Sequence, residues 1–472
     1  MDTKEILGYA AGSIGSAVLA VIILPLLSWY FPADDIGRIV LMQTAAGLTV
    51  SVLCLGLDQA YVREYYAAAD KDTLFKTLFL PPLLSAAAIA ALLLSRPSLP
   101  SEILFSLDDA AAGIGLVLFE LSFLPIRFLL LVLRMEGRAL AFSSAQLVPK
   151  LAILLLPLTV GLLHFPANTA VLTAVYALAN LAAAAFLLFQ NRCRLKAVRR
   201  APFSSAVLHR GLRYGIPIAL SSIAYWGLAS ADRLFLKKYA GLEQLGVYSM
   251  GISFGGAALL FQSIFSTVWT PYIFRAIEAN APPARLSATA ESAAALLASA
   301  LCLTGIFSPL ASLLLPENYA AVRFIVVSCM LPPLFCTLVE ISGIGLNVVR
   351  KTRPIALATL GALAANLLLL GLAVPSGGAR GAAVACAASF WLFFVFKTES
   401  SCRLWQPLKR LPLYLHTLFC LTSSAAYTCF GTPANYPLFA GVWAAYLAGC
   451  ILRHRKDLHK LFHYLKKQGF PL

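Results

Sequence analysis

The sequence predicts an all-α polytopic membrane protein with about 14 transmembrane helices. Of the 472 residues, 60% are hydrophobic and only 12% are charged. The mean hydropathy of +0.81 is far above that of an ordinary soluble domain. Apolar runs of roughly 20 residues, long enough to cross about 30 Å of hydrocarbon, recur along the whole chain with short polar breaks.

The apolar runs are continuous, which indicates helices. Strands of a membrane barrel would instead alternate apolar and polar residues over about ten positions. The predicted spans are residues 6–30, 36–62, 74–95, 110–133, 139–162, 167–190, 212–236, 245–273, 286–315, 322–348, 354–375, 380–397, 411–430 and 435–452. The first run follows MDTKE without an A-x-A-like cleavage site, so we expect a retained first helix.

The distribution of basic residues predicts the topology. The formal net charge is +16, and most of the 37 Lys and Arg residues fall on one side when alternate loops are assigned to opposite sides. The loops of the other side contain only Arg38, Arg96, Lys237, Lys238, Arg323 and Arg380. Cytoplasmic loops collect Lys and Arg, so both termini are predicted to be cytoplasmic. The positive charge thus reflects topology and contact with membrane lipids, and we expect no nucleic-acid partner.

Several kinds of site are not expected. The ten cysteines form no Cys-x-x-Cys pair, which argues against a disulfide framework or a metal cluster. The basic tail, residues 453–472, contains three histidines but is typical of an amphipathic segment on an anionic leaflet. External loops are short and no phosphate-binding loop motif occurs. We therefore expect no cofactor, no metal and no catalytic residue.

A long basic break divides the chain into two halves. This predicted cytoplasmic linker, residues 191–211, separates a six-helix lobe at 1–190 from a second six-helix lobe at 212–397. Two additional transmembrane helices within 411–452 and the basic tail follow.

A weak internal repeat supports two pseudo-symmetric lobes. Two helix–turn–helix joints share a tyrosine, an acidic residue and a glycine at equal spacing. The residues are Tyr30, Asp34 and Gly37 in the first joint and Tyr239, Glu243 and Gly246 in the second. Two like halves around a central site are typical of transporters.

Three cations lie inside predicted spans, where a charge costs about 2.5–3.5 kcal/mol and tends to face a cavity or a partner. Lys150 is close to the bilayer midplane, and Pro149 beside it loosens the backbone hydrogen bonding. Arg127 lies in the fourth span. Arg233 lies near the outer end of the seventh, where its side chain could also reach the interface. Because Arg binds phosphate oxygens bidentately and Lys acts as a point charge, the three predict a phosphate or pyrophosphate ligand.

Four acidic residues are candidates for balancing these cations or for coupling to a cation such as a proton: Asp58, Glu120, Asp232 and Glu340. Asp58 ends the second span, where headgroup contact is the alternative role. Glu120 lies two turns before Arg127 on the same helix face, about 10 Å away along the axis. Each of these two residues therefore needs another partner, or water.

Two stretches resemble a known family. Residues 231–251, ADRLFLKKYAGLEQLGVYSMG, resemble the joint between the seventh and eighth helices of Wzx-type oligosaccharide flippases. Residues 56–66, GLDQAYVREYY, resemble the end of their second helix. In helix count and loop polarity the resemblance covers essentially the whole chain. The motifs distinguish this branch from most transporters but do not identify a sugar.

The resemblance implies the fold of the multidrug/oligosaccharidyl-lipid/polysaccharide exporter superfamily, with two six-helix lobes around a V-shaped cavity. It implies movement of an undecaprenyl-diphosphate-linked oligosaccharide from the cytoplasmic to the periplasmic leaflet of the bacterial inner membrane. The glycan would serve lipopolysaccharide O-antigen, another surface polysaccharide or protein glycosylation. A glycosyltransferase, a polymerase or an oligosaccharyltransferase of the same pathway would be a natural partner.

Two alternatives stay open. A multidrug or lipid II-type exporter would have the same fold, although an exporter of organic cations is expected to have a predominantly acidic cavity. A membrane-embedded glycan polymerase or ligase would commonly carry one large external loop with catalytic residues, and the sequence has no such loop. We therefore expect a transporter and not an enzyme.

Overall fold

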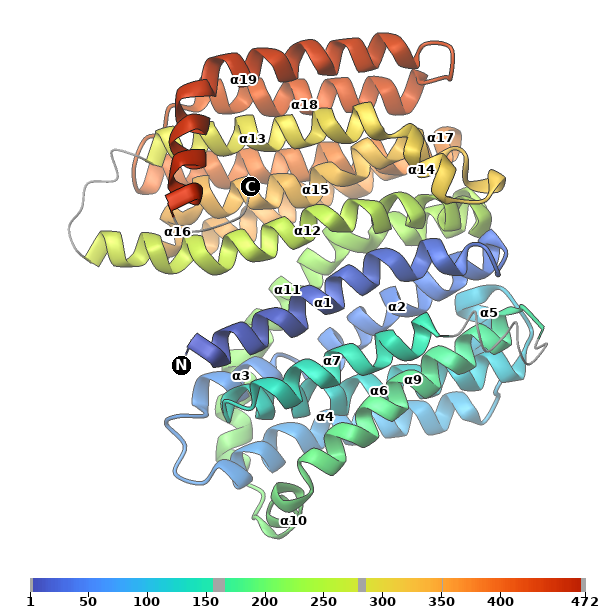
Figure 1. The fold of residues 1–472 in the computed structure, drawn as a ribbon. Coiled ribbons are helices and arrows are strands. Elements are labelled where there is room, and N and C mark those ends of the chain that lie inside the picture. Colours follow the sequence, from blue (N-terminus) through green and yellow to red (C-terminus); the bar gives the residue numbers. More distant parts are fainter. Residues whose placement is uncertain (1–2, 156–165, 279–285, 350, 468–472) are drawn as a thin grey trace. The chain divides into compact units, whose positions relative to one another are not determined.

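The computed structural model describes residues 3–155, 166–278, 286–349 and 351–467, which form helices joined by short connections (Figure 1). Each predicted span coincides with a helix, a part of one, or two consecutive helices, so the all-α fold class is confirmed. The end of the fifth predicted span, residues 156–162, and the end of the tail, residues 468–472, lie outside the described residues.

The chain divides into two compact units, Met1–Ser249 and Met250–Leu472. The helices of the first unit are α1 (Thr3–Leu27), α2 (Ala33–Cys54), α3 (Leu57–Glu64), α4 (Lys71–Leu94), α5 (Leu99–Phe105), α6 (Ala110–Met135), α7 (Ala139–Leu154), α9 (Thr169–Gln190), α10 (Arg192–Arg200) and α11 (Ser205–Tyr239). The following helix, α12 (Gly241–Glu278), begins in the first unit and ends in the second.

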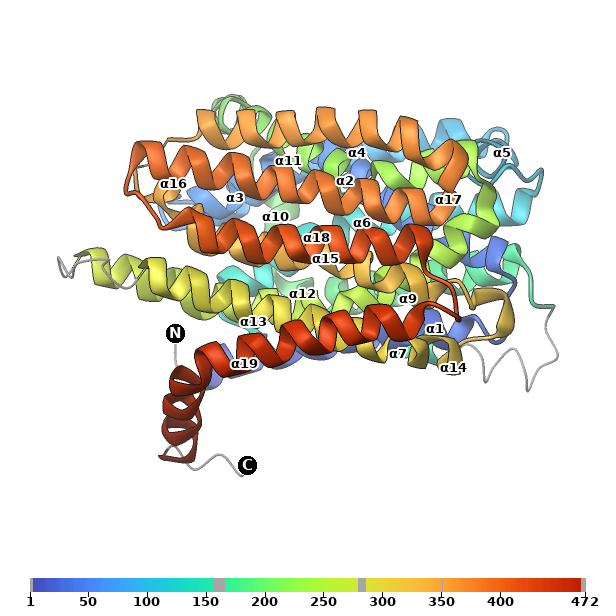
Figure 2. The same cartoon turned by 90° about the horizontal axis from the view of Figure 1, so that it is seen from above.

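The second unit is built around one buried helix. Its elements are α13 (Leu286–Phe307), α14 (Pro309–Leu314), the 3-10 turn η2 (Glu317–Tyr319), α15 (Val322–Ser342), α16 (Ile344–Val348), α17 (Arg353–Leu404), α18 (Arg410–Phe430) and α19 (Tyr436–Lys467). α15 contacts α13, α17 and α18, and 89% of its apolar stretch is buried (Figure 2). α15 is therefore the central helix of this unit.

The protein is a multi-pass membrane protein. Eight helices of the described residues have the length and composition to cross a membrane, and α1 and α7 contribute shorter apolar segments. α17 contains a backbone break at Gly378, with φ 50° and ψ −130°, and thus accounts for two predicted spans. Positive φ is accessible to glycine at little steric cost, so this residue permits the reversal.

The predicted linker is docked onto α4. The Lys76 ammonium donates hydrogen bonds to the carbonyl oxygens of Arg199 and Ala201, at 3.1 and 2.6 Å. The Ser204 amide donates to the Thr77 hydroxyl at 3.2 Å. α11, which the sequence places at the start of the second lobe, packs against α2, α3 and α4 within the first unit. The lobe boundaries drawn from the sequence stay a prediction.

The two joints of the internal repeat pack directly against each other. A Cβ atom added at Gly37 would lie 2.4 Å from the Leu242 carbonyl oxygen, and one at Gly246 would lie 2.2 Å from that of Ala33. Ala33 and Leu242 occupy equivalent positions in the two joints, as do Gly37 and Gly246. The contact is thus reciprocal, which is the pattern that a two-fold relation produces.

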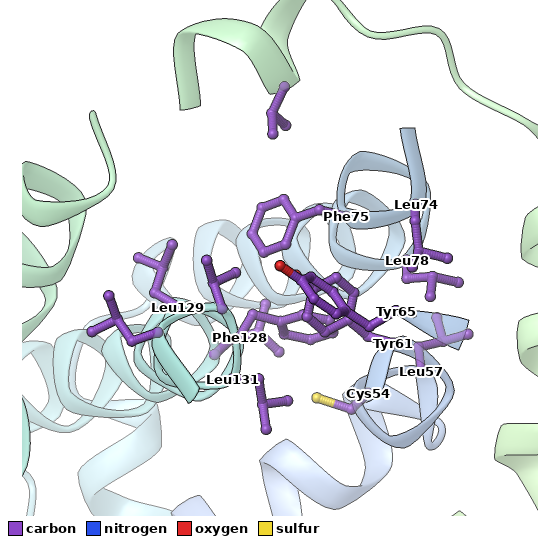
Figure 3. Packing of buried hydrophobic residues seen from close by; sticks show 14 of the residues in the cluster. Cys54, Leu57, Tyr61, Tyr65, Leu74, Phe75, Leu78, Phe128, Leu129 and Leu131 are labelled. Carbon is purple, nitrogen blue, oxygen red and sulfur yellow. The ribbon is translucent and has the colours of Figure 1, made fainter. Parts of the chain in front are cut away.

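An aromatic core lies between α3, α4 and α6. Figure 3 shows the side chains of Tyr61, Tyr65, Phe75 and Phe128 gathered with leucines from the same helices. The Tyr61 and Phe75 ring centroids are 5.7 Å apart, and those of Phe75 and Phe128 are 6.3 Å apart, both edge to face. Leu57 and Phe128 of this core are sequence neighbours of Asp58 and Arg127, so the core fixes the backbone that carries both charged residues.

Candidate functional site

A left-handed break between α2 and α3 positions the first acidic residue. Leu55 and Gly56 have φ values of 47° and 72°. At this point the chain meets α11 backbone to backbone, because a Cβ atom on Gly56 would lie 2.2 Å from the Gly215 carbonyl oxygen. The break redirects the chain so that Asp58 lies in the first turn of α3 and contacts Arg127 of α6.

Asp58 and Arg127 form an ion pair at this position. Arg127 donates from Nε and Nη2 to Asp58 Oδ2, at 3.0 and 2.7 Å, and the Gln59 amide donates to the same oxygen at 2.9 Å. The Asp58 side chain is 9% exposed and the Arg127 side chain is 46% exposed. The acid is therefore held in the protein while the guanidinium stays accessible.

The accessible side of Arg127 faces a cavity of about 400 Å³. The cavity lies within the first unit, between α2, α3, α6 and α11. Its polar side chains are Ser51, Asp58, Gln59, Arg127 and Ser222, and its remaining walls are aliphatic residues, glycines and Phe123.

The pairing with Asp58 does not use all donors of Arg127. A guanidinium carries five N–H groups. Within the described residues, Nη1 donates no hydrogen bond, and only Nε and Nη2 contact Asp58. Arg127 can therefore donate to an oxyanion in the cavity while it remains paired with Asp58.

Glu120 lies in a second cavity with different chemistry. This cavity of about 410 Å³ lies between α2, α4, α5 and α6 and is lined almost entirely by aliphatic side chains. Both carboxyl oxygens of Glu120 are buried, and Thr49 is the polar side chain beside them. No cation lines this cavity among the described residues, in contrast to the surroundings of Asp58.

Lys150 lies on α7, apart from the residues that line the Arg127 cavity. Its ammonium donates a hydrogen bond of 2.6 Å to the carbonyl oxygen of Ser16 on α1. The side chain is half-buried in the contact of α7 with α1. Pro149, beside Lys150, lies inside α7 and has no backbone N–H to donate.

Asp232 and Arg233 form an ion pair near the end of α11. Arg233 Nη1 donates to Asp232 Oδ1 at 3.0 Å and to the Ala229 carbonyl oxygen at 2.7 Å. The Tyr248 hydroxyl donates to the other carboxyl oxygen of Asp232, which is only 2% exposed. This contact joins α11 to α12 inside the first unit, at the stretch that carries the family resemblance.

Glu340 lies on α15 in the second unit, where its electrostatic partner is Lys397 of α17. The close approach of these helices occurs at Gly343, where an added Cβ atom would lie 3.6 Å from Lys397 Cβ. Lys397 is the last residue of the predicted span 380–397. The structure places it inside α17, which continues to Leu404.

Of the candidates, the structure brings together only Asp58 with Arg127 and Asp232 with Arg233. It places Lys150 and Glu120 elsewhere in the first unit and Glu340 in the second. Sequence reasoning missed Gln59, Ser51 and Ser222 as cavity residues. Single polar residues of these types are common at helix ends and on helix faces, so the sequence carried no signal for them.

Comparison with solved structures identifies the fold. The lipid II flippase MurJ, in an inward closed conformation, superposes with a TM-score of 0.68 and 11% sequence identity, covering 95% of this chain and 99% of that one. An inward-facing multidrug resistance MATE family transporter of the MOP superfamily gives 0.56 and 14% identity, covering 82% of this chain and 95% of that one. An outward-facing structure of such a transporter gives 0.53 and 14%, covering 88% and 96%.

At the sequence level no family model matches, and no curated protein matches either. The structural likeness nevertheless extends over 82–95% of this chain and 95–99% of each compared chain. The chain therefore has the membrane transporter fold that the lipid II flippase MurJ shares with the MATE family transporters.

Proposed function

We propose that this protein is a flippase that carries an undecaprenyl-diphosphate-linked oligosaccharide across the membrane by alternating access, as a Wzx-type transporter. The observation that carries the proposal is the Arg127 cavity, in which a half-exposed arginine side chain keeps unused donors among a few polar side chains and largely apolar walls. A diphosphate has several oxygens that can accept hydrogen bonds from the N–H groups of a guanidinium.

The comparisons support a lipid-linked substrate over an organic cation. The lipid II flippase gives a higher TM-score than the MATE transporters, 0.68 against 0.56 and 0.53. The cavity that holds Arg127 also contains one acid, Asp58, which Arg127 already neutralises. An exporter of organic cations would need an unpaired acid at that place, so the multidrug exporter is the second candidate.

Reconstitution tests this function. The full-length protein would be placed in vesicles with an undecaprenyl-diphosphate-linked oligosaccharide bearing a fluorophore, and access of a membrane-impermeant quencher would report movement between leaflets. We expect movement in vesicles with protein, and none in empty vesicles. Uptake of the organic cation ethidium without movement of the glycolipid would contradict the proposal and favour the multidrug exporter.

The same assay tests Lys150. Lys150→Gln removes the charge but leaves a donor for the Ser16 carbonyl oxygen, so the contact of α7 with α1 should persist. We expect movement to fall about tenfold if the ammonium contributes to the anionic substrate, since a charge-assisted contact is worth about 1.5–3 kcal/mol. Lys238→Gln is the matched control, because that lysine stacks on Tyr239, its sequence neighbour, at 5.0 Å. Equal rates of glycolipid movement in the two variants would show that the Lys150 charge does not contribute to transport and that Lys150 has only a structural role.

We further propose that Glu120 carries the coupling proton. Asp58 and Asp232 each have an arginine partner, and Glu340 has Lys397, whereas no cation of the described residues pairs with Glu120. Taking a charged carboxylate out of water without a cation costs several kcal/mol, so such a group exchanges protons when its cavity opens.

Glu120→Gln should abolish the dependence of transport on a pH gradient. The neutral isostere should leave the free energy of unfolding unchanged or slightly higher, because no charge has to be desolvated. The measurement is glycolipid movement with and without an imposed gradient. Glu102→Gln is the matched control, since Glu102 pairs at 2.9 Å with Arg96 on the surface. A Glu120→Gln protein that still responds to the gradient would refute the assignment.

A further inference from the structure

Two arginines of the second unit stack against one phenyl ring. The guanidinium carbon of Arg323, in the first turn of α15, lies 4.6 Å from the centroid of the Phe324 ring. That of Arg380, two positions after the break at Gly378 in α17, lies 4.9 Å from the same centroid. Arg323 and Arg380, which are distant in sequence, thus both make cation–π contacts with the Phe324 ring.

The ring is a fixed support. The Thr428 hydroxyl donates to the Phe324 carbonyl oxygen at 2.9 Å, and the Tyr427 ring lies 5.5 Å from the Phe324 ring, centroid to centroid. A Cβ atom added at Gly431 would lie 2.8 Å from Phe324 Cδ1, so the chain packs closely there. These contacts come from the end of α18 and hold the ring between the helices that carry the two arginines.

Within the described residues, neither arginine has an acidic partner. Arg380 donates one hydrogen bond, to the Cys429 carbonyl oxygen at 3.3 Å. The Nε atom of Arg323 is buried and has no hydrogen-bond partner. A buried donor without an acceptor costs about 1–3 kcal/mol, and two guanidinium groups on one ring repel each other. An anion that contacts both guanidinium groups would offset their repulsion, and the amino end of α15 adds further positive potential.

We propose that Arg323 and Arg380 form a binding site for a phosphate oxyanion, either the headgroup of an anionic membrane lipid or a soluble pyrophosphate. The forked guanidinium groups match the oxygens of phosphate, and Phe324 holds them in place for bidentate contact. The site lies in the second unit and does not depend on the Arg127 cavity of the first unit or on the proposed transport. Both arginines belong to the few basic residues predicted on the outer side of the membrane.

Two arms of one experiment distinguish the sources. In the first, the full-length protein in non-ionic detergent is titrated with sodium pyrophosphate by calorimetry. In the second, the protein is placed in nanodiscs of phosphatidylcholine with phosphatidylglycerol, and the phosphatidylglycerol that remains bound after release is counted by native mass spectrometry. The variants are Arg323→Gln, Arg380→Gln and the double variant. Lys238→Gln is the control, since it removes one cation that also lies over an aromatic ring.

We expect affinity to fall about tenfold for each arginine removed and to be unchanged in the control. Loss confined to the calorimetric arm identifies a soluble phosphate, and loss confined to the nanodisc arm identifies a lipid headgroup. Binding in neither arm, or equal binding by the double variant and the control, overturns the proposal. If the double variant does not fold, Arg380→Lys takes its place, because it keeps the charge and loses the fork. It should then bind several-fold more weakly.

Discussion

Arg127→Ala is expected to reduce transport of the lipid-linked glycan by about 100-fold and to destabilise the protein. The transport loss follows from removing the one guanidinium of the described residues that lines the cavity between α2, α3, α6 and α11. The stability loss follows from leaving Asp58 buried without its cation. Breaking a fully buried pair costs about 3–5 kcal/mol, but the Arg127 side chain is 46% exposed, so we expect about 2 kcal/mol.

A double-mutant cycle separates these two effects. Asp58→Asn combined with Arg127→Ala should recover most of the free energy of unfolding, since no buried charge is left without a partner. Transport should stay low in the double variant, because the donors for the substrate are still missing. Asp58→Asn alone should keep transport, since it frees Nε and Nη2 of Arg127 for the ligand. If the double variant regains transport together with stability, Arg127 acts only as the partner of Asp58.

Gly56→Ala is expected to lower the free energy of unfolding by about 3 kcal/mol. Its φ of 72° costs a residue with a Cβ atom about 1–2 kcal/mol. The added Cβ atom would also lie 2.2 Å from the Gly215 carbonyl oxygen, a backbone atom that cannot move aside as a side chain would. Overpacking of this kind costs about 1–3 kcal/mol. Because Asp58 follows this turn, the variant should also disturb the Asp58–Arg127 pair.

Two single variants isolate the contributions. Gly241→Ala tests backbone strain alone, since Gly241 has a φ of 90° and no atom within 4 Å of an added Cβ atom. Gly215→Ala tests the clash alone, because Gly215 lies within α11 and its Cβ atom would lie 2.5 Å from the Leu55 carbonyl oxygen. The measurement is chemical or thermal unfolding in detergent. A loss for Gly56→Ala no larger than that for Gly241→Ala would show that the backbones do not meet at this point.

The helices were predictable because hydrocarbon leaves the backbone few choices. A continuous apolar run must satisfy its own N–H and C=O groups, so the described part of each predicted span is mainly helical. Finer features were not predictable in this way. Leu55 takes a left-handed conformation although leucine has no preference for it, and the second predicted span therefore breaks into α2 and α3. Lys397 is the last residue of an apolar run, so the sequence predicts that the chain leaves the membrane there. In the structure α17 continues past it to Leu404.

The sequence by itself determined the membrane class and the approximate positions of the helices. It also identified a small set of charged residues within apolar runs, including Asp58, Arg127 and Glu120, whose burial costs free energy unless they face a cavity or a partner. Only the tertiary structure decided which of them meet. Asp58 and Arg127 are 69 residues apart, and their contact depends on the turn at Gly56 and on the packing of α3 against α6. Glu120 lies on the same helix as Arg127 but faces a cavity that no cation of the described part of the chain lines. Pairing depends on helix rotation and packing, which hydrophobic periodicity alone does not specify.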